Sequence, residues 1–264
     1  MRFRLAMLDV DGTLRDEEGW KPGATDLLDE LASTGVPIAL CSGRPVESLL
    51  ALADERQEIA YIAAGSGALV QRRDLDGWTT VGTRFLPLPL VAELETRAAA
   101  LDMEIWAYTI DSWIVKEVTH RVTRDRELTD ATAEVVDQLT GNDQIIKLLA
   151  FARTPEQNSL LVELDSRPEL AVVESYPGYN DVVLATSAAT KGGDILLADL
   201  GLHWSDVLAV GDGQNDLGML SKAGTALLME PLRTEMLHAA QPGQVRVQCP
   251  SLEVALAEVR KAEA

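Results

Sequence analysis

The chain has 264 residues, with 42 Asp and Glu against 23 Lys and Arg, and its formal net charge is −19 at pH 7. Such an acidic chain, without a basic run, argues against binding to a nucleic-acid backbone or an anionic membrane, so we expect neither as a partner. Hydrophobic residues make up 47% and charged residues 25%, as in ordinary globular proteins, and the length fits one or two domains.

The chain has only two cysteines, Cys41 and Cys249, which are too few for a disulfide framework and indicate a reducing compartment. Asp9 and Asp11 interrupt the first apolar run before it reaches the length of a signal peptide, and no stretch of about 18 apolar residues follows. We therefore expect a cytoplasmic protein, as a monomer or a small homo-oligomer.

Three short apolar runs, at residues 5–12, 36–43 and 206–213, each end in a polar cluster, which is typical of buried parallel strands. An amphipathic helix is predicted between the first two runs, at 22–35, which completes a βαβ unit. A helix after residue 45 and a strand and turn at 61–70 continue the pattern. The expected fold class is α/β, with a doubly wound, mostly parallel sheet as its core.

The middle of the chain changes character near Arg84 and again near Ser187, and between these points the elements no longer alternate. Helical and strand patterns are mixed there, with a hairpin predicted to turn at Pro177–Gly178. We therefore expect an inserted α+β cap domain at 84–186, and a core made of 1–83 and 187–264. The core pattern resumes with helices on either side of the third predicted strand.

Two carboxylates two residues apart, Asp9 and Asp11, follow the first predicted strand in the motif DVDGTL. Residues i and i+2 of an extended segment point the same way, so both can face one pocket, as a nucleophile and its acid/base partner require. A turn is the simpler alternative. A calcium loop is excluded, because its sixth and twelfth positions would be Leu14 and Trp20 instead of Gly and Glu.

Two further clusters follow the other predicted strands, CSGRP and VGDGQND. Ser42 and Gly43 can offer a hydroxyl and backbone N–H groups to an anion, and Asp212 and Asp216 are the ligands that Mg²⁺ prefers. Each cluster could also be a simple helix start, with Ser42 or the aspartates as caps. A dinucleotide fingerprint is set aside, because Asp216 stands where its third glycine should be.

Lys191 is a lone cation in SAATKGGD, before a predicted helix. A lone lysine is usually a solvated side chain. Cations are unfavourable at helix N-termini, however, so this position suggests a specific anionic partner, such as Asp9 or a bound phosphoryl group.

In this order and in these strand contexts, DVDGTL, CSGR, TKGG and GDGQND resemble the haloacid dehalogenase (HAD) superfamily of phosphohydrolases. The inserted segment is similar in position and layout to the type IIB cap of the Cof-like branch. The resemblance at the level of motifs covers the core only. One departure is Ser66-Gly67-Ala68, where many Cof-like sequences have Asn-Gly-Ala, and it concerns details of substrate contact.

The resemblance implies a role for each motif residue. It implies Asp9 as nucleophile, Asp11 as general acid and then base, and Lys191 as the group that stabilises charge on Asp9 and the phosphoryl group. The other implied roles are phosphate binding by Thr13, Ser42, Gly43 and Asn215, and a Mg²⁺ site made of Asp9, the backbone carbonyl of Asp11, Asp212 and, in support, Asp216.

The expected function is therefore Mg²⁺-dependent hydrolysis of a small phosphorylated metabolite, such as a sugar phosphate, through an aspartyl-phosphate. Two alternatives stay open: a phosphomutase, which returns the phosphate to sugar, and a phosphometabolite-binding module without turnover. Arg44 is a candidate substrate contact from the core. Cap residues that could face the cleft, although packing or solvation explains most of them equally well, are Trp106, Lys116, His120, Arg121, Tyr176, Tyr179 and Asn180.

Overall fold

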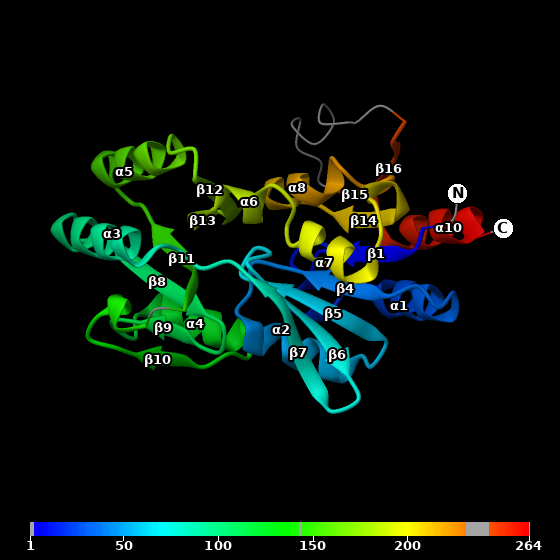
Figure 1. Ribbon diagram of the computed structural model, residues 1–264, viewed down its shortest axis with the longest axis horizontal. Coiled ribbons are helices and arrows are strands. Elements are labelled where there is room, and N and C mark those ends of the chain that lie inside the picture. The colour runs from blue at the N-terminus through cyan, green and yellow to red at the C-terminus, as the bar shows by residue number, and fades with distance from the viewer. Residues whose placement is uncertain (1–2, 143, 231–242, 264) are drawn as a thin grey trace.

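The structure is a computed structural model that describes residues 3–142, 144–230 and 243–263. The chain forms an eight-stranded sheet, a six-stranded sheet and a small two-stranded ribbon. The two large sheets belong to separate lobes that lie side by side, and both chain termini lie at the far end of the larger lobe (Figure 1).

The larger lobe, the core, is built on a mostly parallel sheet with the strand order β16-β15-β14-β1-β4-β5-β6-β7. The strands from β16 to β5 pair in parallel, and β6 and β7 add an antiparallel hairpin at one edge. These strands are β1 (Leu5–Leu8), β4 (Ile38–Cys41), β5 (Ile59–Ala64), β6 (Leu69–Asp74), β7 (Gly77–Thr83), β14 (Val207–Gly211), β15 (Thr225–Met229) and β16 (Val245–Cys249).

Helices cover both faces of the core sheet. One buried cluster of side chains joins the sheet to α1 (Ala24–Ser33), α2 (Val46–Glu55) and α10 (Leu252–Glu263). A second cluster joins the opposite face to α7 (Gly193–Leu200) and α8 (Leu217–Leu220). The apolar side chains of each helix lie on one stripe, and burying a Leu or Val contributes about 1.5–3 kcal/mol, so this patterning fixes which face each helix covers.

The smaller lobe, the cap, has the strand order β10-β9-β8-β11-β13-β12. All neighbours pair antiparallel except β10 and β9, which are parallel. Its elements are α3 (Leu88–Ala100), β8 (Glu104–Thr109), β9 (Trp113–Val115), α4 (His120–Thr129), β10 (Ala133–Val135), the 3₁₀ turn η1 (Leu139–Gly141), β11 (Ile145–Phe151), α5 (Pro155–Asp165), β12 (Leu170–Tyr176) and β13 (Tyr179–Leu184).

One face of the cap sheet packs against helices of the cap, and the other face packs against the core. Helices α3 and α5 bury the outer face, around Ile105, Ile114 and Leu148. The other face carries Trp106 and Trp113, which belong to the same buried cluster as the core strands and α2. The cap therefore packs against the core through apolar side chains.

Most expected elements are present, and the mostly parallel core sheet confirms the predicted fold class. The hairpin at Pro177–Gly178 connects β12 to β13 as expected. The sequence analysis did not anticipate β7, β10, β15, β16 or α4. The remaining short elements are β2 (Arg15–Asp16), β3 (Gly19–Trp20), α6 (Ala185–Ala188), η2 (Trp204–Asp206) and η3 (Gln214–Asp216). None of the helices in the described ranges is both long and apolar enough to cross a bilayer.

Candidate active site

The loop that follows β1 places Asp9 at the carboxyl edge of the core sheet, where β1 lies between β14 and β4. Asp9 is almost fully buried, and its backbone N–H donates to the carbonyl of Val210 at 2.9 Å. Gly12 then turns the chain with a φ of +85°, and a Cβ at this position would lie 2.4 Å from Oδ2 of Asp212. Only glycine allows this loop to approach the Asp212 carboxylate so closely.

Lys191 lies at the centre of the buried charges. Its side chain is 1% exposed, its ammonium donates to Oδ1 of Asp9 at 2.7 Å, and it also pairs with Asp216. Burial alone would lower the pKa of Lys191, but the Asp216 and Asp9 carboxylates raise it well above its ordinary value. The lysine is therefore a permanent cation beside Asp9.

Asp9, Asp212 and Asp216 bring one carboxylate oxygen each to within 4.8 Å of one another. Burial, reinforced by the charge of Asp216, raises the pKa of Asp9 well above its usual range, against the opposing effect of Lys191. Burial and Asp216 also raise the pKa of Asp212. Three carboxylates facing one ammonium leave an excess of negative charge, which suits a divalent cation with oxygen ligands.

The three carboxylates are not equally available to a cation. Asp216 uses one oxygen for Lys191 and the other for the backbone N–H groups of Asp212 (3.1 Å) and Gly213 (2.9 Å). Asp212 accepts a hydrogen bond from the Thr13 hydroxyl through Oδ1, at 2.9 Å. Among the described residues, Oδ2 of Asp9 and Oδ2 of Asp212 accept no hydrogen bond, so these two atoms are free to bind a metal ion directly. Asp216 instead fixes the loop that carries Asp212.

The loop after β4 brings Ser42, Gly43 and Arg44 to the same edge. Arg44 forms a two-pronged pair with Asp11, from Nη2 to Oδ1 at 2.7 Å and from Nε to Oδ2 at 2.9 Å. The Asp11 side chain is half exposed, whereas Arg44 is buried and also donates to Ser48 at 3.0 Å. Asp11 is thus paired with Arg44, and it does not belong to the carboxylate cluster of Asp9, Asp212 and Asp216 in the described part of the chain.

The predicted phosphate contacts lie around this edge in different settings. Ser42 is buried, with its hydroxyl 3.5 Å from Oδ2 of Asp11, and Thr13 is engaged with Asp212. Gly43 follows Ser42 directly. Asn215 is half-buried on η3, with its amide oxygen against Gly213. The structure thus brings Ser42 and Gly43 to Asp11 and Thr13 to the carboxylates, while Asn215 lies at the turn of the Asp212 loop.

Two cap residues that the sequence analysis did not single out also reach this edge. Lys147 from β11 donates to the carbonyl oxygen of Gly43 at 2.8 Å and pairs with Asp181 from β13 at 2.7 Å. Asp181 in turn accepts from the Ser66 hydroxyl at 2.6 Å. Burial lowers the pKa of Lys147, while Asp181 acts in the opposite direction. A lysine inside the apolar run IIKLLAF was the signal in the sequence.

Packing and local pairing account for most of the cap candidates. Trp106 is 1% exposed and packs against Trp113 and Phe151 with tilted rings, at ring-centroid distances of 5.0 and 4.4 Å. The Tyr179 hydroxyl donates to Asp125 at 2.7 Å. Lys116 pairs with Glu95, Arg121 pairs with Glu104, and the Asn180 side chain donates to the carbonyl of Ala150. His120 lines a cap cavity of about 400 Å³, and Tyr176 is exposed.

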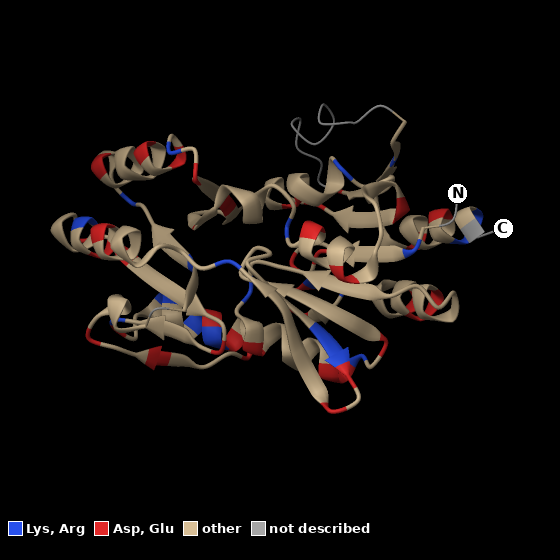
Figure 2. Cartoon of the chain, viewed as in Figure 1, with Lys and Arg blue, Asp and Glu red and all other residues tan. Residues whose placement is uncertain are grey.

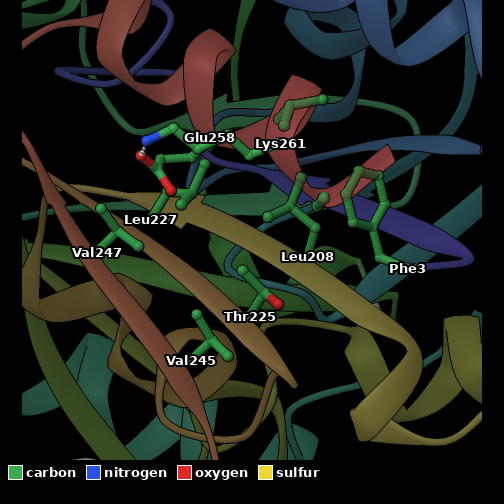
Figure 3. A pocket seen from close by; sticks show the side chains of 10 residues that line it. Phe3, Leu208, Thr225, Leu227, Val245, Val247, Glu258 and Lys261 are labelled. Atoms are coloured by element: carbon green, nitrogen blue, oxygen red, sulfur yellow. Dashed lines mark hydrogen bonds and ion pairs between the residues drawn. The ribbon is translucent and has the colours of Figure 1, made fainter. Parts of the chain in front are cut away.

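A separate cavity of about 220 Å³ lies between α10 and strands β14, β15 and β16 of the core sheet (Figure 3). Its walls are apolar side chains of β14, β15, β16 and α10, with the Glu258–Lys261 pair beside them. None of the motif residues lines this cavity. Lys and Arg residues are scattered over separate elements of both lobes, with Asp and Glu between them (Figure 2).

A family model described as haloacid dehalogenase-like hydrolase matches residues 6–242. The chain belongs to this family. The expected superfamily and hydrolase class are thereby confirmed, and the match spans the core motifs together with the inserted cap.

Curated relatives and solved structures agree with the family. The Bacillus subtilis protein YxeH, provisionally named a phosphatase, is 26% identical, and the similarity covers 90% of this chain and 91% of YxeH. The HMP-PP phosphatase of Yersinia enterocolitica is 25% identical, over 96% of this chain and 93% of its own. A haloacid dehalogenase-like hydrolase from Bacteroides thetaiotaomicron has the same fold, with a TM-score of 0.81 at 20% identity over 98% of this chain and 99% of its own.

A sugar phosphatase described as HAD subclass IIB also has this fold. It matches with a TM-score of 0.80 at 17% identity, over 98% of each chain. Because the match covers the cap as well as the core, the type IIB arrangement expected from the sequence is confirmed at the level of the fold. The names of these relatives support a phosphatase as the type of hydrolase.

Proposed function

We propose that this hydrolase is a Mg²⁺-dependent phosphatase that acts on a small phosphorylated metabolite through an aspartyl-phosphate on Asp9. A sugar phosphate or a related compound is the proposed substrate class. The proposal includes a cytoplasmic enzyme, monomeric or a small homo-oligomer, without nucleic-acid or membrane partners. The catalytic core is proposed to be 1–83 and 187–264, and the cap 84–186.

One observation carries the proposal: Asp9 and Lys191 form a buried pair at 2.7 Å, next to two further carboxylates and the Ser42–Gly43 turn. Phosphoryl transfer depends mainly on positioning and on neutralising the charge of the phosphoryl oxygens. A buried cation beside the nucleophile, with hydroxyl and amide donors nearby, supplies both.

In the proposed reaction, a carboxylate oxygen of Asp9 attacks phosphorus and the bond to the leaving-group oxygen breaks. Asp11 donates a proton to that oxygen. A water molecule then attacks the aspartyl-phosphate, Asp11 accepts its proton, and phosphate leaves with Asp9 regenerated. Lys191 balances negative charge on Asp9 and the phosphoryl group. The Ser42 hydroxyl donates a hydrogen bond to phosphate, and the Thr13 hydroxyl does so after it leaves Oδ1 of Asp212, to which it donates in the structure.

Asp9, Asp212 and the Asp11 carbonyl would hold Mg²⁺, with Asp216 fixing the Asp212 loop through its backbone N–H groups. When bound, the ion neutralises charge on the phosphoryl oxygens. Before Asp11 can transfer a proton, its pair with Arg44 has to open, since a carboxylate held by two guanidinium N–H groups is not free to donate to a leaving group.

The two rival functions make different predictions. A phosphomutase of the phosphomannomutase type would interconvert sugar phosphates with almost no release of free phosphate. A binding module would bind phosphometabolites without turnover. The complete set Asp9, Asp11 and Lys191 disfavours the binding module, because binding alone does not require a nucleophile paired with an acid/base group.

Free-phosphate release from an aryl phosphate and a panel of sugar phosphates tests the proposal, with and without Mg²⁺. We expect release that requires Mg²⁺ and that Asp9→Asn reduces by at least about 10³-fold, because an amide is not a nucleophile toward phosphorus. Release that persists in Asp9→Asn would contradict the role of Asp9, and interconversion of sugar phosphates without release would establish the mutase instead.

A further inference from the structure

The cap meets the Ser42–Gly43 turn at one buried polar junction, which we call the cap seat. It consists of Lys147 and Asp181 from the cap and Gly43 and Ser66 from the core. Lys147 is 2% exposed and Asp181 is fully buried, so solvent does not reach the pair. The charged pair therefore lies in a low-dielectric setting, where hydrogen bonds to charged groups are strong and directional.

Two hydrogen bonds cross from the cap to the core in the seat. Lys147 Nζ donates to the Gly43 carbonyl at 2.8 Å, and the Ser66 hydroxyl donates to Oδ2 of Asp181 at 2.6 Å. Oδ1 of Asp181 accepts from Lys147 and, at 2.9 Å, from Ser175 of β12. The lysine and the aspartate are thus each fixed from both lobes.

The core loop fits the seat tightly. A Cβ on Gly43 would lie 3.1 Å from Oδ2 of Asp181, 3.3 Å from Nζ of Lys147 and 3.4 Å from Oγ of Ser66. Ser66 itself has a left-handed backbone, with a φ of +59°. A strained residue and a close backbone approach at the same point indicate that the junction is built for a defined geometry.

Stability alone is a weak explanation for the Lys147–Asp181 pair. Removing two charges from water costs about as much as their attraction returns, and replacing such a pair by apolar residues is often neutral or stabilising. The neighbours of Lys147 in β11 are apolar and buried, as an ordinary strand requires. What an apolar pair could not supply is the hydrogen bond to the Gly43 carbonyl.

Resting on the proposed function, we infer that Lys147 is a positioning residue, which anchors the Ser42–Gly43 turn to the cap and so holds its phosphate donors in register with Asp9. The anchored atom is the carbonyl next to the donors: Gly43 O accepts from Lys147, while the Ser42 hydroxyl lies beside Asp11. A displacement of about 1 Å in such donors is enough to cost about 10²-fold in rate.

The test is Lys147→Met in the full-length enzyme, with Lys116→Met as the matched control. Lys116 is also a cap lysine in an ion pair, at 3.1 Å from Glu95, but that pair lies within the cap. We expect Lys147→Met to lower kcat for an aryl phosphate by about 10²-fold and to weaken the binding of inorganic phosphate, measured by calorimetry with Mg²⁺ present, by about 10-fold. Lys116→Met should stay within about twofold of wild type for both quantities.

A second variant separates positioning from an uncompensated charge. Lys147→Met alone leaves the Asp181 carboxylate buried without its cation, which destabilises the fold. Lys147→Met combined with Asp181→Asn removes both charges of the pair, and we expect this double variant to recover the melting temperature but not kcat or phosphate affinity. Recovery of the melting temperature together with kcat and phosphate affinity in the double variant would overturn the inference. Loss of the fold in both variants would also overturn it, because the seat would then serve stability.

This test and the test of the proposed function fail separately. If Asp9→Asn does not abolish phosphate release, the proposed function is wrong, whatever Lys147 does. If Asp9→Asn abolishes release but Lys147→Met keeps wild-type kcat and phosphate affinity, the phosphatase stands and the positioning role of Lys147 is wrong.

Discussion

Lys191 shows how strongly one residue constrains this site. It sits 1% exposed between the carboxylates of Asp9 and Asp216, two residues that are far apart in the sequence. Its own backbone is left-handed, with a φ of +50°, which is unusual for a residue with a long side chain. The chain therefore accepts both backbone strain and a buried charge at this point, a combination that is typical of functional sites.

Replacing Lys191 by alanine should therefore affect both chemistry and stability. We expect kcat to fall by at least about 10²-fold, because the cation beside the proposed nucleophile, Asp9, is lost. Without Mg²⁺, the free energy of unfolding should fall by about 3–5 kcal/mol, because the buried Asp9 and Asp216 carboxylates lose their counter-ion. Steady-state kinetics and chemical denaturation measure the two effects.

The exposed Lys222, changed to alanine, is the matched control and should leave both quantities near the wild-type values. Near-normal turnover in Lys191→Ala would show that Lys191 does not serve the reaction. An unchanged free energy of unfolding together with a large loss of kcat would instead show that the carboxylates relax into water when the lysine is removed.

The turn between β5 and β6 shows how one element positions the residues of another. Gly67 has a φ of +84°, and a Cβ there would lie 2.2 Å from the backbone N of Gly192 and from the carbonyl carbon of Lys191. The turn therefore packs directly against the segment that carries Lys191. A side chain at position 67 would clash with this segment, and we expect the clash to displace Lys191 from Asp9.

Gly67→Ala is expected to lower stability and turnover together. Gly35→Ala is the control, since Gly35 also has a positive φ, +73°, but a Cβ there would meet no atom within 4 Å. Both variants carry the backbone cost of alanine at positive φ, about 1 kcal/mol. Only Gly67→Ala should lose a further 1–3 kcal/mol, roughly, from the steric clash, and reduce kcat by at least about 10-fold. Equal effects of the two substitutions would mean that the turn does not hold Lys191 in place.

The limits of sequence-based prediction are visible at the same scale. The elements that end in motif residues were predictable, because a buried apolar run followed by Gly and Asp is a local signal, as at β1 and β14. β15 and β16 were not, since their short apolar runs become strands only by pairing with β14 and with each other. Such pairing is a long-range property.

The same distinction holds for the site. Alternation predicted that Asp9 and Asp11 face one pocket, whereas the structure pairs the Asp11 side chain with Arg44 and groups Asp9 with Asp212 and Asp216. Lys147 and Asp181 were missed, because their role depends on where the cap sheet meets the Gly43 carbonyl. The local sequence contains no information on that contact beyond a charged residue in an apolar run.

At the scale of the whole molecule, the two lobes are joined by apolar and polar side-chain contacts in addition to the chain connections between them. The core-facing side of the cap sheet shares a buried cluster with β1, β4 and α2, and the polar contacts of the cap seat lie beside it. The first connection between the lobes is also held in place, since Arg84 pairs with Asp194 and the N–H of Leu86 donates to Ile145 at 2.8 Å. Removing the cap would expose apolar surface on both partners.

We therefore expect the core and the cap to unfold in one cooperative transition. Hydrogen exchange measured by mass spectrometry along a urea series should show β8 and β11 of the cap losing protection at the same urea concentration as β1 and β4 of the core. Separate midpoints, with the cap strands opening first, would show that the shared cluster does not couple the lobes and that the cap is an independent folding unit.

The central claim is that Asp9 carries the phosphoryl group during turnover, and rapid acid quenching tests it most directly. Enzyme mixed with excess aryl phosphate and Mg²⁺, quenched within one turnover and digested at low pH, should yield the Asp9 peptide with the added mass of one phosphoryl group, and Asp9→Asn should yield none. Phosphate release without a phosphorylated Asp9 peptide at any quench time, or with the label on another residue, would contradict the account.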